Sequence, residues 1–221
     1  MKNELTPTPA AKEKAIAVTQ ALKELYPDAA CSLEWEHGQG WQLMVMGRLS
    51  AQCTDAKVNV VCRELFRVFP SAEALAYGDI AEIERIIRPC GLYRSKAASI
   101  KECSRLLVEK YGGVVPDDID ELLSMPGIGR KIANLLLGDL YGRPGIVADT
   151  HCIRICGRLG FYPTEKKDPL LTERVMSALV EPSEQSDFCH RMVLFGREFC
   201  RSQSPRCKEC PLAELCDSAD N

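Results

Sequence analysis

The sequence is poor in aromatic residues and in long apolar runs. Phe, Trp and Tyr together make up 6% of its 221 residues, so we expect a mainly aliphatic core. No apolar stretch is long enough to cross a membrane, and the first residues, Met1-Lys2-Asn3-Glu4, lack the apolar segment of a signal peptide. We therefore expect the chain in the cytoplasm, where thiols stay reduced.

An excess of positive charge is also missing. The formal net charge is −3 and the pI is about 5.7. Proteins that bind nucleic acids are usually basic, so this acidity counts against such a partner unless basic residues gather locally. Residues 197–208 contain four Lys or Arg and one acidic residue, whereas residues 209–221 contain four acidic residues and no Lys or Arg. The acidity is thus partly segregated into a C-terminal tail.

Strand-like alternation, internal repeats and low-complexity segments are absent as well, and helical periodicity dominates. Helices are predicted from Thr8-Pro9 with the apolar residues Ala15, Val18, Leu22 and Leu25, over 55–69 with Val58, Cys62, Leu65 and Phe69, and after Asp79 with Ile80, Ile83 and Ile87 inward. Further helices are predicted over 94–111, from 116 through 123, and over 130–141, 149–159, 171–179 and 183–199. This pattern predicts an all-α protein with short loops, and residues 142–145 are the best candidate for a crossing between two lobes.

Cysteine is abundant, with twelve in the chain. Eight are scattered and are expected to pack as small apolar residues. The last four, Cys200, Cys207, Cys210 and Cys216, lie within 17 residues and could surround one metal centre. A structural zinc site usually pairs two short cysteine hooks, but only Cys207 and Cys210 form one here. Four thiolates also suit a [4Fe–4S] cluster, so the spacing favours iron–sulfur and leaves zinc open.

A Pro-Gly-x-Gly turn separates two of the predicted helices, over residues 126–129. Gly127 and Gly129 can take positive φ and let the backbone approach another molecule closely. The turn leads into a helix N-terminus, which favours an anion such as a DNA phosphate. A plain corner between two helices is the alternative interpretation.

Lys131 follows this turn, and Asp149 comes 18 residues later in Val147-Ala148-Asp149-Thr150-His151. A lysine here could simply be solvated or bind phosphate, and Asp149 could simply cap a helix. A catalytic role for either residue needs the other blocks of the sequence.

Taken together, these residues resemble the endonuclease III family of DNA glycosylases, within the helix-hairpin-helix superfamily. The match runs from about Trp41 to Cys216. Five blocks carry it, in an order and spacing that are highly specific: Leu49-Ser50-Ala51-Gln52-x-Thr54-Asp55, Gly91-Leu92-Tyr93-x-Ser95-Lys96-Ala97, Pro126-Gly127-x-Gly129-Arg130-Lys131, Asp149-Thr150-His151 and the four-cysteine spacing.

The resemblance implies two all-α lobes with DNA across the cleft between them. A six-helix lobe with the helix-hairpin-helix would span 33–143, and residues 1–32 with 144–221 would form the second lobe, in which the four cysteines hold a [4Fe–4S] cluster. By position, Lys131 matches the family's nucleophile and Asp149 its essential carboxylate. Gln52 and Leu92 match residues that fill the gap left by a flipped base, although helix capping and core packing are their ordinary alternatives.

The implied activity is that of a bifunctional DNA glycosylase and AP lyase that removes damaged pyrimidines, expected to be oxidised ones. We expect a cytoplasmic, nucleoid-associated monomer, with no membrane partner, on double-stranded DNA that carries damaged bases or abasic sites. The expected DNA contacts beyond Gln52 and Leu92 are Gly127, Gly129, Arg130, Arg201 and Arg206.

Two alternatives remain from the sequence. A monofunctional adenine or mismatch glycosylase typically lacks the lysine, and adenine glycosylases carry a further C-terminal domain, whereas this sequence ends five residues after Cys216. A non-catalytic DNA-binding module would not need both Lys131 and Asp149. The chain departs from the family pattern at Arg48, Cys53 and Ile132, which bears on lesion preference and DNA affinity more than on the chemistry.

Overall fold

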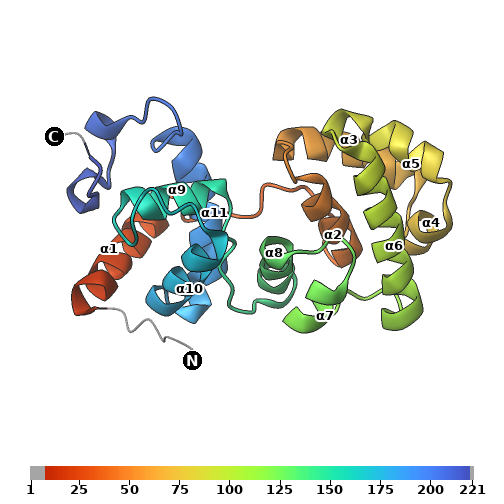
Figure 1. Cartoon of the computed structure of the whole chain (residues 1–221), viewed down its shortest axis with the longest axis horizontal. Coiled ribbons are helices and arrows are strands. Elements are labelled where there is room, and N and C mark those ends of the chain that lie inside the picture. The colour runs from red at the N-terminus through yellow and green to blue at the C-terminus, as the bar shows by residue number, and fades with distance from the viewer. Residues whose placement is uncertain (1–7, 220–221) are drawn as a thin grey trace. The chain divides into compact units, whose positions relative to one another are not determined.

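The computed structural model describes residues 8–219, and in this range every regular element is helical. It contains eleven α-helices and four 3₁₀ turns, with no β-strand among the described residues (Figure 1). The all-α prediction is therefore confirmed. None of the helices in this range combines the length and the apolarity needed to span a membrane.

The described residues divide into two compact units. The central unit is Cys31–Tyr141, and the terminal unit joins the described residues up to Ala30 with those from Gly142 onward. The expected boundaries, after residues 32 and 143, each lie two residues further along the chain.

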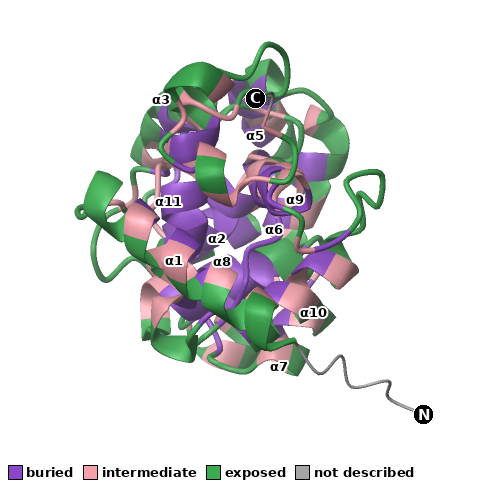
Figure 2. Ribbon diagram, turned by 90° about the vertical axis from the view of Figure 1, so that its left-hand side faces the viewer, coloured by how far each residue is buried: buried purple, intermediate pink, exposed green. Residues whose placement is uncertain are grey.

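The central unit contains seven α-helices and one 3₁₀ turn, one α-helix more than the six expected. They are α2 (Gly40–Leu49), α3 (Asp55–Val68), α4 (Ala72–Tyr77), α5 (Ile80–Ile87), η1 (Arg88–Cys90), α6 (Tyr93–Tyr111), α7 (Ile119–Ser124) and α8 (Arg130–Tyr141). Helix α2 packs against α3, α6 and α8. Nearly all its side chains are buried, which makes it the core of this unit (Figure 2).

The terminal unit is built from both ends of the chain. Its helices are α1 (Pro9–Leu25), α9 (Thr150–Arg158), α10 (Pro169–Leu179), η2 (Pro182–Glu184), α11 (Gln185–Glu198), η3 (Cys207–Glu209) and η4 (Ala213–Leu215). Helices α1 and α9 both pack against α10 and α11. The fully buried Phe188 and Phe195 of α11 supply the largest apolar side chains of this core.

Side-chain caps explain where many helices begin. Thr8, Thr54, Asp79 and Asp118 each accept a hydrogen bond from a backbone N–H in the first turn of α1, α3, α5 and α7. Helix α6 ends at Tyr111 and is followed by Gly112, whose φ of 60° is easily adopted by glycine.

Two details of the predicted core are wrong. Leu25 is 38% exposed and Ile80 is 40% exposed, although both were expected to point inward. Leu25 is the last residue of α1 and Ile80 the first of α5, and a terminal turn has fewer neighbours to cover it. The sequence pattern also missed α2, which is buried on almost every side and so lacks an apolar stripe, and the six-residue α4.

Candidate active site

Of the two glycines in the turn between α7 and α8, Gly127 takes the positive φ that the sequence allows and Gly129 does not. Gly127 has φ of 80°, and a Cβ placed on it would lie 2.6 Å from Nε of Arg48. A Cβ on Gly129 would meet no atom within 4 Å. Gly127 is therefore required by the fold, whereas the backbone at Gly129 is open to another molecule.

Arg48 contacts this turn from α2. Its Nε donates a hydrogen bond of 2.7 Å to Oγ of Ser99 on α6, and its side chain lies against Gly127. The arginine that departs from the family pattern thus ties α2, α6 and the turn together within the central unit. Ile132, another departure, is buried in the first turn of α8.

Arg130 and Lys131 open helix α8 directly after the turn. Both are exposed, whereas the next seven residues of the helix are buried. The N–H groups of a helix's first turn lack intrahelical partners, so this end carries partial positive charge. The structure therefore presents the Lys131 amine at the surface, beside a backbone suited to an anion.

Asp149 caps α9 in the terminal unit. Its Oδ1 accepts a hydrogen bond of 2.7 Å from the backbone N–H of Cys152, and its own N–H donates to the carbonyl of Val147. Asp149 therefore does cap a helix. The cap engages one carboxylate oxygen, and the residue remains partly exposed, so capping and a chemical role are compatible.

Gln52 and Leu92 share a rare backbone conformation. They are two of three non-glycine residues with positive φ in the described part of the chain, at 55° and 47°. Such a conformation costs about 1–3 kcal/mol per residue and persists only where the surroundings enforce it. Leu92 is also 62% exposed, which rules out core packing as its role, and the cap of α3 is Thr54 rather than Gln52.

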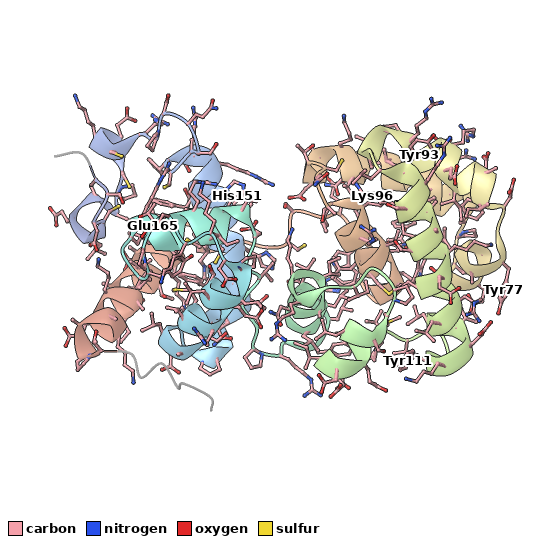
Figure 3. All side chains as sticks on the ribbon, in the orientation of Figure 1. Tyr77, Tyr93, Lys96, Tyr111, His151 and Glu165 are labelled. Atoms are coloured by element: carbon pink, nitrogen blue, oxygen red, sulfur yellow. The ribbon has the colours of Figure 1, made fainter. Side chains whose placement is uncertain are left out.

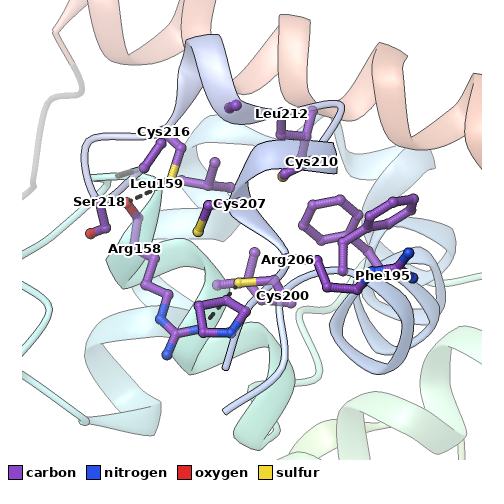
Figure 4. A pocket seen from close by; sticks show the side chains of 15 residues that line it. Arg158, Leu159, Phe195, Cys200, Arg206, Cys207, Cys210, Leu212, Cys216 and Ser218 are labelled. Carbon is purple, nitrogen blue, oxygen red and sulfur yellow. Dashed lines mark hydrogen bonds between the residues drawn. The ribbon is translucent and has the colours of Figure 1, made fainter. Parts of the chain in front are cut away.

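The four C-terminal cysteines line one cavity of about 200 Å³ (Figure 4). All four thiols are free. The cavity has room for a group of several atoms rather than a single ion, and among residues 8–219 no set of three or more His, Cys, Asp or Glu is arranged to hold one metal ion. Burial raises the pKa of the Cys210 and Cys216 thiols, so thiolates here need positive charge among them.

Two arginines of α9 hold the start of this cysteine loop, and the sequence analysis missed both. Arg154 donates to the carbonyl of Cys200 at 2.8 Å, and Arg158 donates to the carbonyls of Arg201 at 2.7 Å and Ser202 at 3.1 Å. Arg158 Nη1 also lies 3.4 Å from the Cys200 thiol (Figure 4). These contacts join residues that are more than 40 positions apart in the sequence, so no local sequence pattern predicts them.

The two loop arginines expected to bind DNA differ in their surroundings. Arg201 is exposed, and its Nε donates to the carbonyl of Arg197. Arg206 pairs with Glu209 and lies over the ring of Phe199, with 5.9 Å between Cζ and the ring centre. Its guanidinium therefore has protein partners that an added phosphate would have to share or replace.

The two glycines of the turn should differ in how much they contribute to stability, so Gly129 serves as the control for Gly127. Gly127→Ala should lower the free energy of unfolding by about 1–3 kcal/mol, because alanine is strained at this φ and displaces Arg48. Gly129→Ala should change it by less than about 0.5 kcal/mol. Urea unfolding of both variants measures the difference, and equal midpoints would show that the turn does not need its first glycine.

Comparisons with known proteins agree on one family. Residues 45–182 match the model of the HhH-GPD superfamily base excision DNA repair protein. The endonuclease III of Synechocystis sp. is 42% identical over 94% of both chains, and that of Bacillus subtilis is 42% identical over 88% of both chains.

Solved structures give the same result. One described as a non-covalent endonuclease III–DNA complex and one described as a trapped endonuclease III–DNA covalent intermediate each superpose with a TM-score of 0.88. Both are 38% identical to this chain and cover 94% of it and 96% of their own length. The chain therefore belongs to the endonuclease III family of the HhH-GPD superfamily of base excision DNA repair proteins.

Proposed function

We propose that this chain is a bifunctional DNA glycosylase and AP lyase of base excision repair, with Lys131 as its nucleophile. The observation that carries the assignment is an exposed lysine in the first turn of α8, directly after the Gly127–Gly129 turn. The relative described as a trapped covalent intermediate with DNA supports a covalent mechanism. The substrate is double-stranded DNA in the bacterial nucleoid, carrying abasic sites or damaged bases, with oxidised pyrimidines as the expected class.

The reaction follows from an amine held at the DNA surface. A base inside the duplex is out of reach, so it must be extruded at a cost of about a few kcal/mol. Nζ of Lys131 then bonds to the sugar C1′ while the glycosidic bond breaks, and the base leaves with the bonding electrons and takes up a proton. As the sugar ring opens, O4′ gains a proton and the amine becomes a Schiff base. The Schiff base acidifies C2′, whose proton is lost as the bond from C3′ to the phosphate oxygen breaks.

Asp149 is proposed to stabilise the positive charge that develops on the sugar. A carboxylate placed where charge develops lowers the barrier without reorganising. The cap on α9 fixes one of its oxygens in position through the Cys152 N–H. The helix thus orients the carboxylate that the chemistry needs.

The remaining residues are proposed to bind the DNA phosphates and to fill the opened duplex. Gly127, Gly129 and Arg130 are proposed to hold phosphate at the start of α8, where backbone N–H groups favour an anion. Gln52 and Leu92 are proposed to enter the gap left by the extruded base, which fits their exposure and strained backbone. Arg201 and Arg206 are proposed phosphate contacts of the cysteine loop, and Arg206 would exchange or share its pairing with Glu209.

The cysteine cavity is proposed to hold a [4Fe–4S] cluster on Cys200, Cys207, Cys210 and Cys216. Four free thiols around one cavity suit this group, and the Arg158 guanidinium beside Cys200 suits a thiolate. When bound, the cluster would cross-link the loop and so fix the segment that carries Arg201 and Arg206.

Borohydride trapping tests the nucleophile. The wild-type protein, reduced during turnover of lesion DNA, should become covalently joined to the DNA. Lys131→Gln should fold and bind duplex DNA but give neither adduct nor strand break. Lys131→Arg keeps the charge yet cannot supply a neutral amine, so it should fail in the same way. Normal cutting by the arginine variant would reduce Lys131 to a phosphate contact and favour a monofunctional glycosylase.

Asp149→Asn separates the cap from the chemistry. Asparagine caps helices about as well as aspartate, so thermal unfolding and affinity for lesion DNA should stay close to wild type. Base excision under single-turnover conditions should fall by about 100-fold or more, as for other lost transition-state charges. Unchanged turnover would leave Asp149 as a cap only.

Metal analysis tests the cysteine site independently of activity. The purified chain should be brown and contain about four iron atoms, as four thiolates at this spacing imply. Cys207→Ser should lose iron, colour and solubility together. Cys31→Ser, in the central unit, is the matched control and should keep all the iron. A colourless wild-type protein that contains zinc would overturn the assignment.

A further inference from the structure

Lys96 of α6 is a buried cation in the central unit (Figure 3). It is 0% exposed and is one of the largest fully buried side chains of the protein. A lysine is rarely buried in this way, because removing an ammonium group from water is costly unless its hydrogen bonds are replaced. Burial correspondingly lowers the pKa of Lys96.

Three backbone carbonyls replace the lost water. Nζ of Lys96 donates to the carbonyls of Leu49 at 2.9 Å, Ala51 at 2.7 Å and Cys90 at 2.8 Å, which uses all three protons of an ammonium group. Leu49 is the last residue of α2 and Cys90 the last of η1. The ends of these elements carry unpaired carbonyls and partial negative charge, so one cation joins two C-terminal ends.

Two of the three bonded carbonyls lie within two residues of Gln52 or Leu92, whose backbones are strained. Ala51 directly precedes Gln52, and Cys90 lies two residues before Leu92. The backbone N–H of Lys96 also donates to the carbonyl of Leu92 at 3.1 Å. That backbone bond opens α6 whatever the side chain at position 96, whereas the Lys96 ammonium itself holds the chain just before Gln52 and just before Leu92.

We propose that Lys96 is a positioning residue that fixes Gln52 and Leu92 for entry into the duplex. The proposal rests on the roles assigned above to those two residues. Two side chains from separate loops can fill one gap only if their spacing is set beforehand, and the Lys96 ammonium is the group that joins both loops. Being fully buried, it acts through them and not on DNA.

A purely structural role is the competing explanation, and α6 offers a matched control. Lys101 lies on the same helix and also donates through Nζ to a backbone carbonyl, that of Gly78 at the end of α4. It makes the same kind of bond with neither strained residue nearby in the sequence. Lys101→Met removes that bond, whereas Lys96→Met removes the bonds beside Gln52 and Leu92.

The experiment compares these variants on duplexes that contain a non-cleavable abasic-site analogue beside a fluorescent base analogue. Fluorescence reports local unstacking, and single-turnover excision is measured in parallel on lesion DNA. Lys96→Met should lose the fluorescence change and slow excision by about 10- to 100-fold, as expected for misplaced groups. Its affinity for undamaged duplex should change far less. The yield of the Lys131 adduct on pre-formed abasic sites, which need no base release, should also change far less. Lys101→Met should match wild type in every assay.

A double-mutant cycle separates this role from general stability. If Lys96 acts through the two residues, Leu92→Ala and Gln52→Ala should have smaller effects in the Lys96→Met background than in wild type. Fully additive effects, or wild-type fluorescence and excision by folded Lys96→Met, would overturn the proposal. If Lys96→Met is unfolded at the assay temperature, Lys96→Gln, which keeps an amide donor, takes its place in the same cycle.

The single variants distinguish a failure of the roles proposed for Gln52 and Leu92 from a failure of the role proposed for Lys96. Wild-type fluorescence with Leu92→Ala and with Gln52→Ala would show that these residues do not open the duplex, which overturns their proposed function and the inference with it. Loss of the signal in those variants but not in the Lys96 variant would overturn the role of Lys96 alone.

Discussion

Short helices leave many backbone carbonyls unpaired, and basic side chains satisfy them in this protein. Every helix C-terminus has up to four carbonyls with no intrahelical partner. Lys96 reaches the ends of α2 and η1, Lys101 the end of α4, and Lys14 the carbonyl of Leu159 that ends α9. Arg154 and Arg158 do the same for the loop that follows α11. Cations at helix ends therefore join segments that are far apart in sequence.

This use of basic residues changes what the net charge means. Several of the 28 Lys and Arg residues are bonded to backbone carbonyls inside a unit, so total charge is a poor guide to the surface that meets DNA. Each basic side chain used in this way is withdrawn from the surface, so the pI of about 5.7 does not describe the charge that DNA would meet. Where individual side chains lie decides the matter more than their number.

Much of the fold was predictable because most helices are amphipathic and capped by their own sequence. Thr8 and Asp79 mark helix starts that the structure confirms. Helix α2 was not predicted, because a helix buried on nearly all sides lacks the apolar periodicity by which helices are recognised. The glycine turn, Lys131, Asp149 and the cysteines stand in contiguous motifs and could be named from sequence. The bonds of Lys96 to Leu49 and Ala51, and those of Arg154 and Arg158 to the cysteine loop, could not, because they join a side chain to a backbone carbonyl dozens of residues away.

Helix α9 shows how such bonds couple parts of one unit. Its first turn receives the Asp149 cap, and four and eight residues after Thr150 its arginines hold the segment from Cys200 to Ser202. Residues spaced by four lie on the same face of a helix, so one face of α9 carries both loop contacts. The helix that Asp149 caps is therefore the same helix that holds the start of the cysteine loop.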